Sequence, residues 1–199
     1  MRINLPKQIE TKRLTLKPYT LDKNYIQLYV DSINQNLDWL QRFCHFDGPM
    51  TFEKQKAFLE ECINKNKENG YAIWTKSKED EPEELVGSIS AFHFRKEKGK
   101  RIAELGIFLL EKFAKKGYAH EANSALESAL FKAGLDETIL HIRSDNVASL
   151  KSARAQGYTK IAENTDKGYI RFLFHKTKQQ WEHEHWLELQ REKFKGNTL

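Results

Sequence analysis

The turn that follows residue 110 has the residue types of an anion-binding site. It places Lys115, Lys116 and Gly117 between an apolar strand and an amphipathic helix. Free backbone N–H groups and the helix dipole attract anions at a helix N-terminus, and Gly117 and Ala119 would let a phosphate approach the backbone. The glycine spacing is neither GxGxxG nor that of a P-loop. The turn therefore predicts an anion site, although an ordinary strand–turn–helix with solvated lysines has the same composition.

A strand–helix–strand–helix pattern positions this turn. Residues 102–110 predict the first strand, and residues 117–133 carry alanine and leucine at helical spacing. Residues 138–142 predict the second strand, and Asn146 opens a shorter helix that ends at Gly157. Such a segment behind an antiparallel meander predicts a mixed sheet with helices on both faces.

The flanking segments complete an α/β (α+β) domain with a mostly antiparallel sheet. Apolar–polar alternation predicts its strands, and apolar residues at helical spacing predict its helices. We expect strands at residues 13–18, 71–74, 85–92, 158–162 and 168–175, helices after Asp22 and at residues 51–69 and 179–199, and charged turns at residues 76–84 and 95–101.

The composition is that of one globular domain. The chain has 199 residues, 39% hydrophobic and 31% charged, which is enough to bury a single core. It contains no apolar stretch of signal-peptide or membrane-span length, and its two cysteines form no CxxC pair. We therefore expect a soluble cytoplasmic protein without membrane contact. The net charge of +5 suits a polyanionic small molecule, an acidic protein or a nucleic acid, but the lysines are spread along the chain.

Three motifs occur in the order in which a known enzyme family has them. They are Glu104-x-Gly106-Ile107-x-Leu109 in the strand, Ala114-Lys115-Lys116-Gly117-Tyr118-Ala119 in the turn, and Asn146-x-x-Ser149 followed by Gly157-Tyr158. Over residues 10–177 the chain resembles the GNAT superfamily of N-acetyltransferases, most closely its RimJ/RimL group of ribosomal-protein acetyltransferases. Ala114 departs from the pattern, because the family usually has a basic or amide side chain there. The resemblance implies a catalytic domain at 1–177 and a C-terminal helical extension at 178–199.

The resemblance also implies how acetyl-CoA is bound. Two parallel strands, residues 102–110 and 138–142, would splay apart, and the pantetheine arm would lie between them. The pyrophosphate would lie on the amides that follow Ala114, and no metal is implied. The implied cofactor-binding residues are Ile107, Phe108, Leu109, Lys115, Lys116, Gly117, Tyr118, Ala119 and Asn146.

Two side chains are implied as catalytic. Glu104 would act through a water as the general base for the acceptor amine, and Ser149 would donate a hydrogen bond to the departing thiolate. A backbone amide near Ile107 would stabilise the oxyanion. Without the resemblance, Glu104 could simply pair with a surface lysine, Ser149 could bond the backbone, and Asn146 is a ready helix N-cap.

The histidines do not have the spacing of a metal site. His183 and His185 in the C-terminal helix point apart, and HExxH is absent. The others are scattered along the chain: His45, His93, His120, His141 and His175.

The predicted reaction is acetyl transfer from acetyl-CoA to a primary amine. The favoured acceptor is a protein N-terminus of the ribosomal-protein serine or alanine type, and the alternative is a small amine such as a polyamine, an aminoglycoside or an amino-acid conjugate. Residues 34–69 would shape the acceptor site. A basic nucleic-acid-binding protein is a rival that only the tail supports, and Ala114 keeps open an acetyl-CoA sensor without catalysis. Trp181 and Trp186 would pack on the chain's own core or on a second copy in a homodimer.

Overall fold

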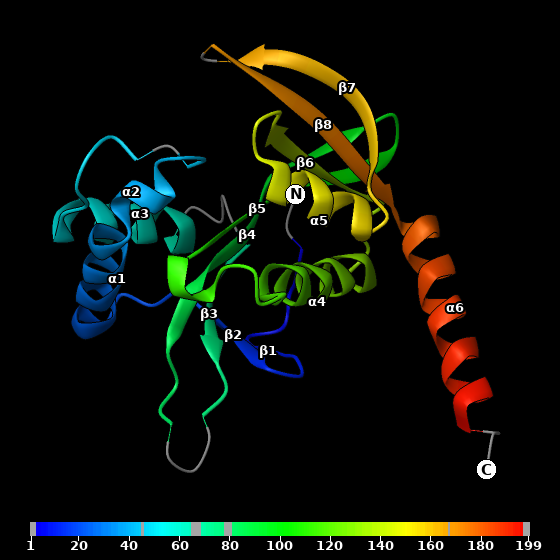
Figure 1. The fold of residues 1–199 in the computed structure, drawn as a ribbon, viewed down its shortest axis with the longest axis horizontal. Helices are drawn as coiled ribbons and strands as arrows, with labels where there is room; N and C mark the ends of the chain where they lie inside the picture. The colour runs from blue at the N-terminus through cyan, green and yellow to red at the C-terminus, as the bar shows by residue number, and fades with distance from the viewer. Residues whose placement is uncertain (1–2, 45, 65–68, 78–80, 167, 197–199) are drawn as a thin grey trace.

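The chain folds into one mixed sheet with helices on both of its faces (Figure 1), in a computed structural model that describes residues 3–44, 46–64, 69–77, 81–166 and 168–196. Within these residues the eight strands lie in the order β1-β2-β3-β4-β5-β6-β8-β7. The strands are β1 (Ile9–Glu10), β2 (Leu14–Pro18), β3 (Asn69–Thr75), β4 (Leu85–Glu97), β5 (Lys100–Leu109), β6 (Glu137–Arg143), β7 (Thr159–Asp166) and β8 (Tyr169–Thr177). The helices are α1 (Lys23–Gln35), α2 (Leu37–Leu40), α3 (Phe52–Asn64), α4 (Tyr118–Lys132), α5 (Val147–Ala155) and α6 (Lys178–Gly196), with a short 3-10 helix, η1, at Glu111–Phe113.

The sheet splays apart between β5 and β6. Among the described strands only these two are paired in parallel, with α4 as their crossover. Their register begins at Ile102 opposite Glu137 and ends at Glu104 opposite Ile139. Beyond that point β5 continues against β4 alone, and β6 continues against β8. The predicted mostly antiparallel sheet with a splayed central pair is therefore confirmed.

The two faces of β4 and β5 have different roles. On one face, small and aliphatic side chains are buried together with leucines of α4: Ile89, Ala91, Ala103, Leu105, Leu126 and Leu130. Burying one such leucine contributes about 1.5–3 kcal/mol relative to leaving it exposed. The other face is flanked by α1 and α3, which pack on each other through Ile26, Val30 and Leu59. The alternation of the strands thus separates a core face from a second face that is free to form a site.

The predicted helix boundaries at Asp22, Gly117 and Asn146 are confirmed. The Asp22 carboxylate accepts the Tyr25 N–H at 3.0 Å and caps α1, as the sequence pattern indicates. Gly117 is the N-cap of α4 and has φ of 80°. The Asn146 side chain accepts the Ser149 N–H at 3.1 Å at the start of α5.

The structure differs from the sequence prediction in several connections. The charged turn expected at 95–101 is shorter, because Lys98 and Gly99 close the hairpin in two residues with left-handed φ. Asn69 and Gly70 open β3 instead of ending the preceding helix. Residues 65–68 and 78–80 of the predicted helix and turn lie outside the described residues, as do 197–199 at the end of the tail helix. The sequence reading also missed β1, α2 and η1.

The C-terminal helix α6 follows β8 directly. A capping box fixes its start, since the Gln180 N–H bonds the Thr177 hydroxyl and the Thr177 N–H bonds the Gln180 side chain. Trp181 is buried, with its ring 5.6 Å from that of Phe131 in α4. Trp181 therefore packs on the core of its own chain and not on a second copy. None of the described helices, α6 included, is long and apolar enough to span a membrane.

Candidate active site

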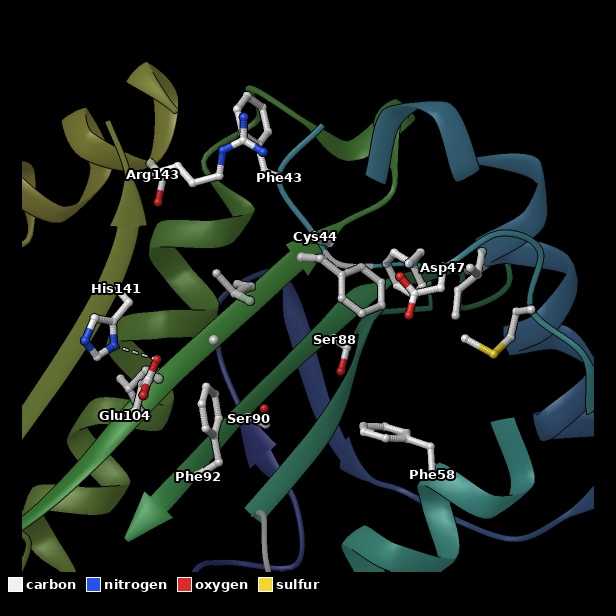
Figure 2. Close-up of a pocket in the computed structure, with 18 of the residues that line it drawn as sticks. Phe43, Cys44, Asp47, Phe58, Ser88, Ser90, Phe92, Glu104, His141 and Arg143 are labelled. Carbon is white, nitrogen blue, oxygen red and sulfur yellow. Dashed lines mark hydrogen bonds and ion pairs between the residues drawn. The ribbon is translucent and has the colours of Figure 1, made fainter. Parts of the chain in front are cut away.

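A cavity of about 680 Å³ lies where β5 and β6 separate (Figure 2). One wall comes from α1, α3 and the loop before α3, and the other from β6, β8 and the start of α5. Three cross-strand pairs of β4 and β5 form its floor: Ser88 with Phe108, Ser90 with Gly106, and Phe92 with Glu104. The cavity therefore joins the helical wall to the gap between the splayed strands.

Gly106 keeps this floor open beside Glu104. A Cβ at this position would lie 2.9 Å from Cε1 of Phe92, so any side chain there would displace the phenylalanine ring. Residues two apart in a strand share one face, and Gly106 therefore lies on the same face as Glu104. This packing gives the Glu-x-Gly spacing a physical reason.

The Glu104 carboxylate is bonded by two histidines. Its Oε1 lies 2.8 Å from Nδ1 of His141 on β6, and its Oε2 lies 3.0 Å from Nδ1 of His93 on β4. Figure 2 shows Glu104 and His141 facing each other across the splayed strands. The Glu104 side chain is only 14% exposed. A carboxylate held in this way at the edge of a cavity can accept a proton from a ligand.

A β-bulge directs His93 to Glu104. Regular alternation would place His93 on the face opposite to Phe92, and Phe92 is the cross-strand partner of Glu104. The register shifts between Phe92 and Arg95, and His93 has φ of 49°. Bulges redirect side chains in this manner. A non-glycine residue in the left-handed region costs about 1–3 kcal/mol and is typical of functional sites.

Part of the β5 backbone faces the gap. The Leu110 N–H donates to the Val86 carbonyl at 2.9 Å. Every second residue before Leu110, such as Phe108 and Gly106, is therefore also hydrogen-bonded to β4. Because bonded and non-bonded residues alternate along an antiparallel pair, Ile107 and Leu109 direct their N–H and C=O groups to the β6 side. The Leu109 carbonyl accepts the Trp39 indole N–H at 3.0 Å. The polar groups of Ile107 and the N–H of Leu109 remain for a ligand.

The turn before α4 presents a row of backbone donors. Lys115 and Gly117 have φ of 60° and 80°. Across the described residues, none of the N–H groups of residues 115–120 donates a hydrogen bond. The side chains of Lys115 and Lys116 are exposed beside them. An N–H row at a helix start with adjacent cations is suited to a phosphate group.

Arg13 fastens this turn to the sheet. Its Nη1 donates to the Lys116 carbonyl at 2.9 Å, its Nε pairs with the Glu121 carboxylate at 2.7 Å, and its guanidinium lies 4.5 Å from the centre of the Tyr118 ring. Burial alone would raise the pKa of Glu121, but hydrogen bonds from Thr11 and Arg13, with the Arg13 charge, lower that pKa below its ordinary value. Arg13 thus adds a cation that holds the predicted pyrophosphate turn in shape.

Asn146 and Ser149 line the opposite wall. The Asn146 side chain is engaged as the N-cap of α5, while the Ser149 N–H is the group it binds. Both residues lie at the cavity together with Glu104. The fold therefore brings the two predicted catalytic residues, Glu104 and Ser149, to one cavity from different strand–helix units.

Other reactive groups of the cavity are less suited to chemistry. Burial raises the pKa of the Cys44 thiol to about 11, so this thiol stays protonated at neutral pH and is a poor nucleophile. Arg143 pairs with Asp145 and lies 3.7 Å from the Tyr169 ring centre. No group of three or more His, Cys, Asp or Glu side chains within the described ranges could hold a metal ion.

Comparison with known proteins identifies the family. The model of the acetyltransferase (GNAT) domain matches residues 13–159. The chain belongs to this family. It is an acyltransferase, and the match spans all three motifs on which the sequence prediction rested. The splayed strands β5 and β6 and the turn before α4 lie within the matched residues.

Solved structures of other acetyltransferases have the same fold. RimL, a ribosomal L7/L12 alpha-N-protein acetyltransferase solved with coenzyme A, is 18% identical with a TM-score of 0.71, over 85% of this chain and 97% of that one. The ribosomal-protein-S5-alanine acetyltransferase of Vibrio fischeri is 17% identical with a TM-score of 0.73, over 87% and 98%. The microcin C7 self-immunity acetyltransferase MccE, solved with acetyl-CoA and AMP, is 20% identical with a TM-score of 0.69, over 83% and 93%. At these identities the likeness establishes the fold.

Three residues of the candidate site, His141, His93 and Arg13, were not predicted from the sequence. His141 had a signal, because it interrupts an otherwise apolar strand beside the one that carries Glu104. His93 had none, since alternation predicts the wrong face for it. Arg13 lies 108 residues from Glu121, a separation over which no local pattern indicates a contact.

Proposed function

We propose that this acetyltransferase moves an acetyl group from acetyl-CoA to a primary amine, the N-terminal amine of a protein of the ribosomal-protein serine or alanine type. The observation that carries the proposal is the Glu104 carboxylate on the cavity floor, bonded by His141 and His93 where the strands part. Glu104 is the general base in this proposal.

The chain offers acetyl-CoA a matching set of groups. The Ile107 N–H and C=O and the Leu109 N–H are available for the amides of the pantetheine arm, as in the pairing of an added strand. The unpaired N–H groups of residues 115–120, with Lys115 and Lys116, suit its pyrophosphate. The Arg13 clamp offsets the missing basic side chain at position 114 by keeping this turn in place. Acetyl-CoA supplies an activated acetyl thioester.

The chain's own groups then manage protons around the acceptor. An ammonium ion is not nucleophilic, so it must lose a proton before it reacts. Glu104 accepts that proton at its carboxylate, directly or through a water. Ser149, on the opposite wall, provides the hydroxyl proton donor for the sulfur end of the site. No side chain nucleophile is required, which agrees with the raised pKa of Cys44.

The acceptor side favours a chain terminus with a small first residue. Ser88 and Ser90 form the floor beside Phe92, and the cavity extends to the outer wall made by α3 and the loop before it. RimL and the Vibrio fischeri enzyme, which share the fold, are by their names ribosomal-protein acetyltransferases. The alternative acceptor is a small amine; MccE, which shares the fold, is by its name a self-immunity acetyltransferase and not a ribosomal-protein acetyltransferase.

Thermal unfolding with acetyl-CoA, NAD or ATP tests the cosubstrate. We expect a stabilisation only with acetyl-CoA, of about 2.7 kcal/mol at 100 times its dissociation constant. No shift with acetyl-CoA would refute the assignment of the turn and the gap.

Thiol release in an acceptor panel tests the substrate class. The panel contains peptides that begin with serine or alanine, the same peptides with an acetylated N-terminus, spermidine and an aminoglycoside. We expect release with the free peptides and none with the blocked ones. Release with spermidine or the aminoglycoside alone would replace the protein terminus by a small amine.

A further inference from the structure

The Glu104 carboxylate lies between one histidine that lines the cavity and another that is exposed to bulk solvent. His141, bonded to Oε1, lines the cavity and its side chain is 25% exposed. His93, bonded to Oε2, does not line the cavity and its side chain is 72% exposed. One oxygen of the carboxylate is therefore bonded to a histidine of the cavity wall, and the other to a histidine that is largely exposed to water.

Acetyl transfer to an ammonium ion releases a proton that must leave the site. An N–C bond to the acetyl group forms and the C–S bond of the thioester breaks. Of the two protons that the ammonium nitrogen loses, one ends on the sulfur of coenzyme A and the other goes to solvent. Glu104 is 14% exposed, so it needs a partner to discharge the proton before the next turnover. An imidazole titrates close to neutral pH and is suited to that task.

We propose that His93 is the proton exit of this active site. Glu104 takes the proton from the acceptor amine and passes it to Nδ1 of His93, and the imidazole then releases a proton to water from its other nitrogen, Nε2, while His141 orients the carboxylate. The inference rests on the proposed function, with Glu104 as its base. His93 acts through Glu104 and is a positioning residue in this account, since it does not line the cavity.

The backbone around His93 supports this role. An exposed ion pair alone contributes little stability, yet the chain places His93 beside Glu104 by a register shift and a left-handed φ of 49°. Such strain at an exposed position is typical of a functional constraint. The other charged side chains of the cavity come from the loop before α3, from α3, β6 and β8, and they are Asp47, Lys54, Arg143 and Arg171. Among them, Arg143 is paired with Asp145 and Arg171 with Asp166.

The test is the turnover of His93→Asn with a serine-initiated peptide in dilute, non-imidazole buffer. Asparagine tolerates the left-handed φ, so the backbone is kept while the imidazole is lost. We expect kcat to fall roughly 10-fold, less than the roughly 100-fold or more that a general base itself contributes, and to recover on addition of imidazole. The stabilisation by acetyl-CoA should equal that of the wild type, and His183→Asn, an exposed histidine on α6, should keep the wild-type kcat.

Two results would overturn the relay. One is a wild-type kcat for His93→Asn in dilute buffer, and the other is a loss that imidazole does not restore. Glu104→Gln, assayed in parallel, separates the causes. If Glu104→Gln is inactive while His93→Asn is fully active, the acetyl transfer and its base stand and only the proton exit is wrong. If Glu104→Gln is fully active, the base in the proposed function is wrong, and the relay fails with it.

Discussion

Two glutamates of this acetyltransferase are each held by two partners, and the partners differ in kind. Glu104 is bonded by His141 and His93 beside the cavity. Glu127 on α4 is 2% exposed and receives the Lys176 ammonium at 3.0 Å on one oxygen and the Thr138 hydroxyl at 3.1 Å on the other. The partners of Glu104 are thus two imidazoles, whereas those of Glu127 are an ammonium and a hydroxyl.

The closed cluster around Glu127 extends to the C-terminal helix. Lys176 also donates to the Gln156 carbonyl at 2.8 Å and pairs with Glu184 of α6 at 2.6 Å. Burial, with the nearby Glu127 charge, raises the pKa of Tyr158 well above its ordinary value, so its hydroxyl stays protonated. The contrast indicates that a buried carboxylate held by an ammonium and a hydroxyl stabilises the fold, and that one bonded by imidazoles at a cavity can do chemistry.

The largest effect should follow from breaking the closed cluster. Lys176→Met leaves the Glu127 charge buried without its cation, which should lower the free energy of unfolding by about 3–5 kcal/mol. Chemical denaturation measures this loss. The double variant Lys176→Met/Glu127→Met should regain much of it, because no fully buried charge is then left unpaired; Glu184, the other partner of Lys176, is 39% exposed. A single variant as stable as the wild type would contradict the assignment of Glu127 as a buried charge.

Removing one of the two histidines that bond Glu104 should affect the reaction rate more than the stability of the fold. His141→Gln should lower kcat/KM about 10-fold, equivalent to about 1.4 kcal/mol, with little change in thermal unfolding. His175→Gln is a matched control, since His175 also lies 2.8 Å from a glutamate, Glu137, and is also 25% exposed, but away from the cavity. Equal kcat/KM values for His141→Gln and His175→Gln would show that the His141–Glu104 pair has no special role in the reaction.

Filling the floor beside Glu104 should have a moderate effect. Gly106→Ala forces the Phe92 ring to move, and overpacking of this kind costs about 1–3 kcal/mol. We expect a KM for the acceptor raised several-fold, with acetyl-CoA binding retained. Steady-state kinetics with varied peptide measures it, and an unchanged KM would show that the floor does not contact the acceptor.

The smallest effect concerns Glu121, whose carboxylate is neither at the cavity, as Glu104 is, nor fully buried, as Glu127 is. Its pKa is lowered in the folded state from the ordinary 4.5, so its contribution to stability is complete above that value and is lost as the pH falls through the lower, folded pKa. The stability difference between the wild type and Glu121→Gln should therefore be constant near neutral pH and shrink in acid. Denaturation midpoints from pH 7 to about 3 measure this difference. A difference that grows in acid would show that folding raises the pKa of Glu121 instead of lowering it.

The sequence predicted the elements better than the contacts between them. Periodicity and caps located α1, α4 and α5 because these signals act within a few residues, and the ordered motifs indicated the family. The partners of Glu104 depend on register, which a single bulge in β4 changes by one residue. The Arg13 clamp and the Trp39 bond to Leu109 join distant segments. The sequence therefore predicted some of the cavity residues, but the groups that surround Glu104 could be identified only from the folded structure.

The central claim is that Glu104 removes a proton from the acceptor amine. The direct test is kcat/KM of Glu104→Gln and the wild type from pH 6 to about 9 with one peptide acceptor. We predict a loss of about 100-fold near pH 7 that narrows as the pH rises, because a free α-amine, with a pKa of about 7.7–8.0, loses its proton to solvent there. Unchanged turnover of Glu104→Gln across this range would contradict the account.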